Sequence, residues 1–137
     1  MSNYGLQLML RISKIQNKEV LNDAGFIARL LVDLVGRIGM RVLAGPLTGI
    51  EGGEPEKQGC SGIIILYESH AAIHTYSYLG EAFVDIFSCK AFDPADVVLF
   101  LRETLGDLEI TEEKIVDRGR DWSRNIAKEF GDWAGER

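Results

Sequence analysis

The chain of 137 residues is long enough for one domain with its own hydrophobic core. Hydrophobic residues make up 46% and charged residues 26%, a balance typical of a soluble globular protein and not of a disordered chain. The net charge of −6, without a basic stripe, argues against nucleic-acid binding, and no apolar run is long enough to span a membrane.

The N-terminal part of the chain predicts a strand followed by a helix. Residues 4–12 alternate apolar and polar side chains, which predicts a strand with one buried face. Apolar residues at helical spacing predict a helix over residues 26–38. Either Asn22 or Asp23 is expected to cap its N-terminus, and Gly39 suits its end.

A glycine-rich segment follows this helix. Residues 41–44 predict a short strand, and residues 45–59, which contain five glycines and two prolines, predict a long loop. The phosphate-binding patterns GxxxxGK[ST] and GxGxxG are absent from it. Contact with a substrate and a flexible crossing both remain open for this loop.

The second half of the chain predicts more strands and a second helix. The unbroken apolar run over residues 62–67 predicts a strand that is buried on both faces. Asp93 as N-cap and Pro94 in the first turn predict a helix that ends at Gly106. Further strands are expected over residues 71–75, 82–87 and 108–116.

These elements predict one domain, residues 1–119, followed by a C-terminal tail, residues 120–137. In the tail, Trp122, Ile126 and Phe130 recur at four-residue spacing, which predicts a short amphipathic helix docked on the body or on a partner. Two helices on one face of a mainly antiparallel sheet make an α+β fold, a two-layer sandwich.

The side chains best suited to chemistry lie in two short segments, residues 67–75 and 85–89. An imidazole exchanges protons near neutral pH, and a hydroxyl or thiol becomes a nucleophile beside such a base. The groups in question are Ser69, His70, His74 and Cys89.

Residue types alone leave several interpretations of these segments open. Ser69, His74 and Asp85 could form a hydrolase triad, although the GxSxG turn of many hydrolases is absent. The two histidines could ligate a metal with Asp85 and Cys89, but the spacing matches no recognised motif, so we expect no metal. Either cysteine, Cys60 or Cys89, could also be a buried apolar thiol.

Four motifs together point to one family. The chain has Ser-Gly at residues 61–62, Glu-Ser-His at 68–70, Ile-His-Thr at 73–75 and Asp-Ile-Phe-Ser-Cys at 85–89. In this order and spacing it resembles the small bacterial and archaeal form of the pyruvoyl-dependent S-adenosylmethionine decarboxylases. The resemblance covers most of residues 4–118, and the combination of motifs is far more specific than any single one.

The resemblance implies that the chain cleaves itself between Glu68 and Ser69. Ser69 would attack the Glu68 carbonyl, and elimination would then convert Ser69 into a pyruvoyl group, the cofactor. The resemblance also implies that Ser61 assists the acyl shift, that His74 assists the elimination, and that Cys89 returns a proton to the substrate. The pyruvoyl ketone would form a Schiff base with an α-amino group and act as the electron sink for decarboxylation.

The segment that binds the nucleoside departs from the family pattern. The family has Trp-Pro-Glu after His-Thr, with the ring stacking on adenine and the acid binding the ribose; this chain has Tyr76-Ser77-Tyr78. Tyr76 can still stack, Tyr78 has no carboxylate, and Glu81 is an acid close by in sequence. S-adenosylmethionine is the expected substrate, with arginine or ornithine as alternatives.

The resemblance also implies a cellular role. It predicts a cytoplasmic enzyme of polyamine and spermidine synthesis that works as a homodimer of processed protomers. A cytoplasmic location agrees with the two cysteines, too few for a disulfide framework, and with the absence of a signal peptide at residues 1–5. A non-catalytic binding or regulatory relative is a further hypothesis, motivated by the altered substrate segment.

Overall fold

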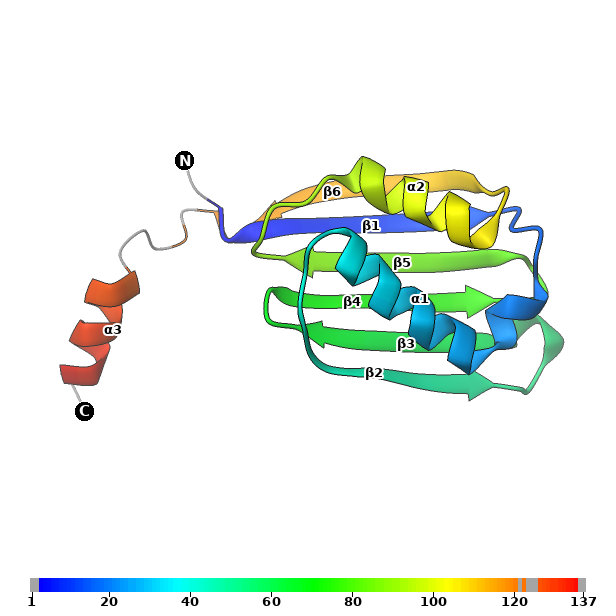
Figure 1. Cartoon of the computed structure of the whole chain (residues 1–137), viewed down its shortest axis with the longest axis horizontal. Helices are drawn as coiled ribbons and strands as arrows, with labels where there is room; N and C mark the ends of the chain where they lie inside the picture. The colour runs from blue at the N-terminus through cyan, green and yellow to red at the C-terminus, as the bar shows by residue number, and fades with distance from the viewer. Residues whose placement is uncertain (1–2, 121, 123–125, 136–137) are drawn as a thin grey trace.

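A computed structural model describes residues 3–120, 122 and 126–135 of the chain. Its sheet has six strands in the order β2-β3-β4-β5-β1-β6, and every neighbouring pair is antiparallel (Figure 1). The strands are β1 (Gly5–Ser13), β2 (Val42–Glu51), β3 (Gly59–Leu66), β4 (Ser69–Tyr76), β5 (Glu81–Ser88) and β6 (Glu109–Arg118). The sheet confirms the predicted α+β class.

Helices α1 (Ala24–Arg37) and α2 (Pro94–Leu105) lie over the same face of this sheet (Figure 1). The side chains of Asp23 and Asp93 accept hydrogen bonds from backbone N–H groups of the first turn, so of the two caps expected for α1 the structure selects Asp23, and α2 has the predicted cap. The core fills the space between helices and sheet, with fully buried side chains such as Leu31, Ile73 and Leu101. The two-layer arrangement is therefore confirmed.

The third helix, α3 (Ile126–Gly135), lies apart from the two layers in Figure 1. Among the described residues there are also two short 3-10 turns, η1 (Glu19–Asn22) and η2 (Pro55–Lys57). Within the described residues, no helix has the length and apolar character needed to cross a membrane.

None of the helices in the described residues covers the second face of the sheet, which corrects the prediction for residues 62–67. Burial alternates along β3: Ile64 is fully buried, whereas Ile63 and Ile65 are 43% and 47% exposed. The apolar run predicted burial on both faces, but helices cover only one. We call the other side the helix-free face; its exposed apolar side chains include Leu47, Ile63, Ile65 and Phe83.

The predicted loop over residues 45–59 is also wrong in its first half. Residues up to Glu51 continue β2 and pair with β3, with register shifts between Val42 and Ala44 and between Ala44 and Leu47. β2 is an edge strand, and an edge tolerates glycine, proline and bulges because one side of its backbone has no ladder to maintain. Only residues 52–58, which include η2, lie outside the strands.

Candidate active site

The candidate cleavage junction lies in the hairpin that joins β3 to β4. Leu66 pairs with Ser69, so Tyr67 and Glu68 alone form the turn. Ser69 has φ 148°, and among the described non-glycine residues only Lys14 shares a positive φ. Such a backbone conformation costs a non-glycine residue about 1–3 kcal/mol, so the peptide next to Ser69 is strained.

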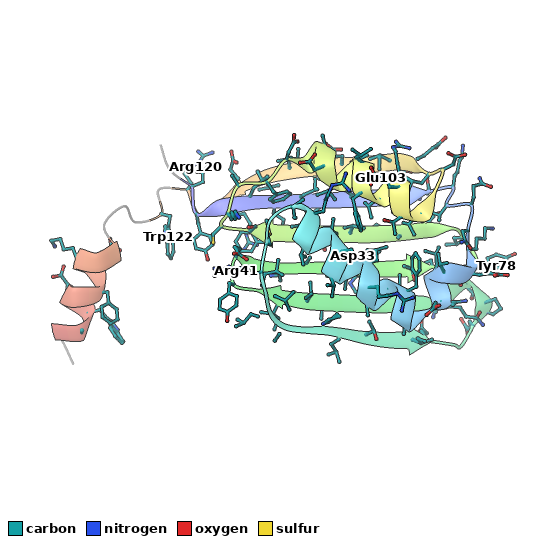
Figure 2. All side chains as sticks on the ribbon, in the orientation of Figure 1. Asp33, Arg41, Tyr78, Glu103, Arg120 and Trp122 are labelled. Carbon is teal, nitrogen blue, oxygen red and sulfur yellow. The ribbon has the colours of Figure 1, made fainter. Side chains whose placement is uncertain are left out.

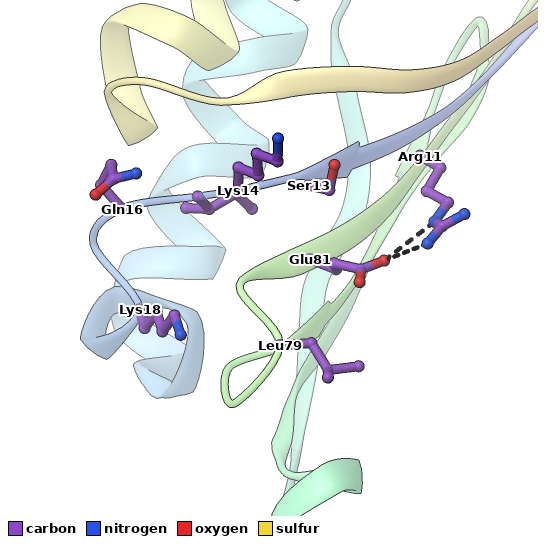
Figure 3. Close-up of a pocket in the computed structure, with 8 residues that line it drawn as sticks. Arg11, Ser13, Lys14, Gln16, Lys18, Leu79 and Glu81 are labelled. Atoms are coloured by element: carbon purple, nitrogen blue, oxygen red, sulfur yellow. Dashed lines mark hydrogen bonds and ion pairs between the residues drawn. The ribbon is translucent and has the colours of Figure 1, made fainter.

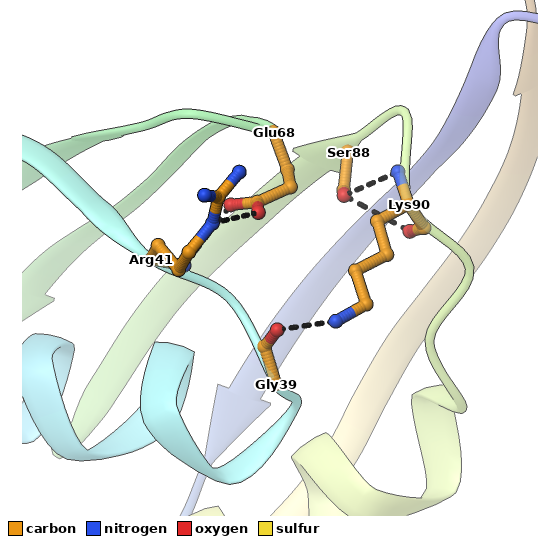
Figure 4. Close-up of polar contacts among 5 residues, drawn as sticks. All are labelled: Gly39, Arg41, Glu68, Ser88 and Lys90. Carbon is orange, nitrogen blue, oxygen red and sulfur yellow. Dashed lines mark hydrogen bonds and ion pairs between the residues drawn. The ribbon is translucent and has the colours of Figure 1, made fainter.

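Glu68 is bound through both its main chain and its side chain. Its carbonyl oxygen accepts a hydrogen bond of 2.9 Å from the backbone N–H of Cys89. Its carboxylate accepts bonds of 3.0 Å from the backbone N–H and 3.1 Å from Nε of Arg41 (Figure 4). The Arg41 backbone N–H, helped by the guanidinium, lowers the pKa of Glu68 against the opposing effect of burial, so the carboxylate stays charged.

Cys89 reaches the junction because it follows the last residue of β5. Ser88 pairs with Ser69 across β4 and β5, and its buried hydroxyl bonds both the N–H and the carbonyl of Lys90, each at 2.9 Å. Lys90 in turn donates from Nζ to the carbonyl of Gly39 at 2.6 Å (Figure 4). This bonded turn leaves Cys89 exposed beside the junction.

Ser61 and His74 form a second group on the helix-free face. They pair across β3 and β4, and Ser61 Oγ lies 2.8 Å from His74 Nδ1. His74 is five positions beyond Ser69 along β4. At about 3.3 Å per residue that separation is roughly 17 Å. The structure therefore divides the predicted cluster: Ser69, Glu68 and Cys89 lie together, and Ser61 and His74 lie elsewhere.

The hydrolase triad does not assemble in this chain. His74 has Ser61 as its partner, and Asp85 lies opposite Ala72 of β4 instead of beside the imidazole. His70 packs edge-on against Phe87, with ring centroids 5.7 Å apart. In the described part of the chain, no three His, Cys, Asp or Glu side chains gather closely enough to hold a metal ion.

The residues predicted to bind substrate lie at the His74 end of the sheet. Tyr76 and Glu81 pair across β4 and β5; Tyr76 packs edge-on against Phe83, and Glu81 accepts bonds of 2.9 and 3.0 Å from Arg11. Figure 3 shows Glu81 and Arg11 in a hollow that Lys14 and Lys18 also line.

Tyr78 belongs to the exposed turn between β4 and β5. Figure 2 places it at the end of the molecule opposite Arg41. Tyr78 is thus distant from the cleavage junction within one protomer.

Sequence analysis did not identify Arg41 as a residue of the candidate site. It was expected only to begin a short strand, and it is 27 positions from Glu68. No motif connects the two residues; they meet because β2 pairs with β3. A charged residue at a strand start gives no local signal for such a contact.

Comparison with known proteins identifies the family. The sequence profile described as S-adenosylmethionine decarboxylase matches residues 7–119. The chain belongs to the S-adenosylmethionine decarboxylase family. Two relatives named S-adenosylmethionine decarboxylase proenzyme are similar to it. The one from Clostridium tetani is 32% identical over 84% of this chain and 87% of its own. The one from Clostridium kluyveri is 33% identical over 71% of this chain and 74% of its own.

A solved structure supports the fold of this decarboxylase family member. The crystal structure of the adenosylmethionine decarboxylase from Aquifex aeolicus superimposes with a TM-score of 0.70. It covers 87% of this chain and 93% of its own, at 19% sequence identity. At that identity the likeness establishes the shared fold, and the family membership rests on the sequence matches.

Proposed function

We propose that this chain is a self-processing, pyruvoyl-dependent S-adenosylmethionine decarboxylase of polyamine synthesis, cleaved between Glu68 and Ser69. The observation that carries the proposal is the junction itself. A strained Ser69, with φ 148°, follows a carbonyl that already accepts a hydrogen bond of 2.9 Å from the Cys89 N–H. A backbone donor on that oxygen stabilises the negative charge that develops when a nucleophile attacks the carbonyl.

The processing chemistry uses only this chain and water. Ser69 Oγ gives up its proton and bonds to the Glu68 carbonyl carbon; the C–N bond breaks, and the nitrogen gains a proton, which leaves an ester. A base then removes the Ser69 α-proton while the bond between the Ser69 β-carbon and Oγ breaks, and Glu68 leaves as a carboxylate that keeps this oxygen. The dehydroalanine formed at position 69 takes up water and releases ammonia, which leaves the pyruvoyl group. No oxidant or reductant is required.

In this proposal the base for these steps comes from a second copy of the chain. His74, bonded to Ser61, is the base we assign, and within one protomer it lies roughly 17 Å from Ser69 at about 3.3 Å per residue. A two-fold that stacks two helix-free faces and reverses the strand direction brings Ser61 and His74 of one copy to the end of the sheet where the β3–β4 hairpin of the other copy carries Ser69. The exposed Ile63 and Phe83 support burial of this face.

The residues of this chain would then divide the remaining tasks. The pyruvoyl group at position 69 would supply the electron sink for loss of carbon dioxide. Cys89, exposed beside the junction, would return a proton to the substrate carbon. From the opposing copy, Tyr76 would stack on the adenine, with Tyr78 and Glu81 near the ribose; Glu81 would have to exchange its bond to Arg11.

The catalytic domain in this proposal is residues 1–119, which the family match over residues 7–119 supports. Residues 120–137 form an appended tail. A reducing, cytoplasmic compartment suits the two free cysteines, Cys60 and Cys89.

Mass analysis under denaturing conditions tests the proposal. Freshly made protein should separate into residues 1–68 and a fragment 69–137 with a ketone at its start, and Ser69→Ala should stay whole. An intact chain from correctly folded wild type would refute self-processing. Release of carbon dioxide from S-adenosylmethionine, arginine and ornithine then identifies the substrate, and a processed protein inactive on all of them would support the non-catalytic alternative.

A further inference from the structure

Arg41 contacts both residues that precede the proposed cleavage junction. Its carbonyl accepts a hydrogen bond of 3.0 Å from the Tyr67 N–H, and its guanidinium carbon lies 4.8 Å from the centre of the Tyr67 ring. Its backbone N–H and Nε bind the two carboxylate oxygens of Glu68 at 3.0 and 3.1 Å. Figure 4 shows the arginine side chain directed at the Glu68 carboxylate from the segment that links α1 to β2.

These contacts restrain Glu68 on the side opposite to Cys89. The Cys89 N–H binds the main-chain oxygen of Glu68, whereas Arg41 binds its side chain. The Glu68 side chain is 9% exposed and the Arg41 side chain 72%, so Arg41 covers the carboxylate from the solvent side. With both groups bound, the Glu68 carbonyl cannot rotate to relax the positive φ of Ser69.

We propose that Arg41 is a positioning residue for self-cleavage: it holds the Glu68 carbonyl in the orientation that Ser69 Oγ attacks. This inference rests on the proposed function, since it concerns the rate of the acyl shift. Arg41 acts through Glu68 and Tyr67 and touches none of the reacting atoms. A peptide held in one orientation needs less reorganisation to reach the transition state for attack.

The same contact suits the step in which Glu68 leaves. Elimination turns the Glu68 acyl group into a new main-chain carboxylate, so that residue 68 then carries two negative charges. The guanidinium of Arg41 is already bonded to the first of them at 3.1 Å and offsets their mutual repulsion. Arg41 therefore favours both the start and the end of processing.

The test follows cleavage of the full chain after cell-free synthesis, by mass spectrometry over time. We expect Arg41→Ala to slow the appearance of the 69–137 fragment about five- to tenfold. This factor corresponds to the loss of one charge-assisted hydrogen bond, whose strength is reduced because Arg41 is exposed to solvent. Arg37→Ala is the matched control, because Arg37, on α1, also binds a carboxylate, but its partner is Glu103 of α2 at 2.9 Å and not a residue of the hairpin. It should cleave at the wild-type rate.

Coupling between Arg41 and Glu68 separates positioning from a general structural role. If Arg41 acts through the carboxylate, Arg41→Ala combined with Glu68→Gln should be no slower than the slower single variant. Hydroxylamine, which cuts an ester but not an amide, should reveal less ester in Arg41→Ala, because the acyl shift itself is retarded. Arg41→Gln, which keeps most of the packing stem, replaces Arg41→Ala if that variant does not fold.

The outcomes are distinguishable from failure of the proposed function. If the wild-type chain does not cleave, self-processing is wrong. If wild type cleaves and the Arg41 variants cleave equally fast, or if their effect adds fully to that of Glu68→Gln, the role given to Arg41 is overturned.

Discussion

A mixed dimer of two inactive chains tests whether the catalytic groups come from different copies. One chain carries Ser69→Ala and the other His74→Ala, each with its own affinity tag, and both are expressed together. Each variant alone should remain whole, because every site in its homodimer lacks either the nucleophile or the base. In a mixed dimer, one site combines the intact Ser69 of one chain with the intact His74 of the other.

The expected yield follows from the geometry of the protomer. Because β4 separates Ser69 from His74 by roughly 17 Å at about 3.3 Å per residue, a chain cannot bring its own His74 to its own Ser69. Mixed dimers isolated through both tags should therefore contain a cleaved His74→Ala chain and an intact Ser69→Ala chain, about half of all chains. Denaturing mass spectrometry measures this ratio directly.

The control pairs wild type with a chain that carries both substitutions. In that dimer the wild-type Ser69 faces a copy without His74, so the wild-type chain should stay whole. Cleavage there, or an uncut His74→Ala chain in the first mixed dimer, would show that each protomer completes its own site and would refute the composite arrangement.

Three further predictions concern the interface, the core and pH. Ile63→Glu on the helix-free face should yield a protein that sediments as a monomer and no longer cleaves. Leu99→Glu, at a similarly exposed position on α2, should dimerise and cleave normally. The same sedimentation and cleavage in both variants would count against the interface. Thr75→Val should lower the free energy of unfolding in urea by about 1–3 kcal/mol, because the buried hydroxyl accepts a bond of 2.8 Å from the Cys60 N–H and donates its one proton to the Leu21 carbonyl at 2.6 Å, with the Cys60 carbonyl 3.0 Å away; an unchanged midpoint would contradict this role. In the uncleavable Ser69→Ala chain, the pKa of Glu68 lies below its ordinary value, so the contribution of Glu68 to stability is present above the ordinary pKa and is lost as the pH falls through the lowered pKa. Adding Glu68→Gln should therefore weaken the fall of the urea unfolding midpoint at acid pH. Midpoints that fall equally with pH in the two chains would exclude the effect.

Local sequence patterns determined much of the fold. The alternation in β1, the apolar stripe of α1, and the aspartate caps at Asp23 and Asp93 gave elements close to those observed. Strand alternation and helix capping depend on residues that are close together in the sequence, so both can be predicted from the sequence directly. The motifs that carry the family resemblance are also contiguous, and the family match agrees with them.

Strand pairing decided what the sequence did not display. β2 extends through a glycine-rich segment because its backbone pairs with β3, and β3 is exposed on one face because both helices pack on the other. Pairing also brings Ser61 to His74 and Arg41 to Glu68. These relations depend on which backbone groups meet across the sheet, a non-local choice with little trace in the residues that make the contacts.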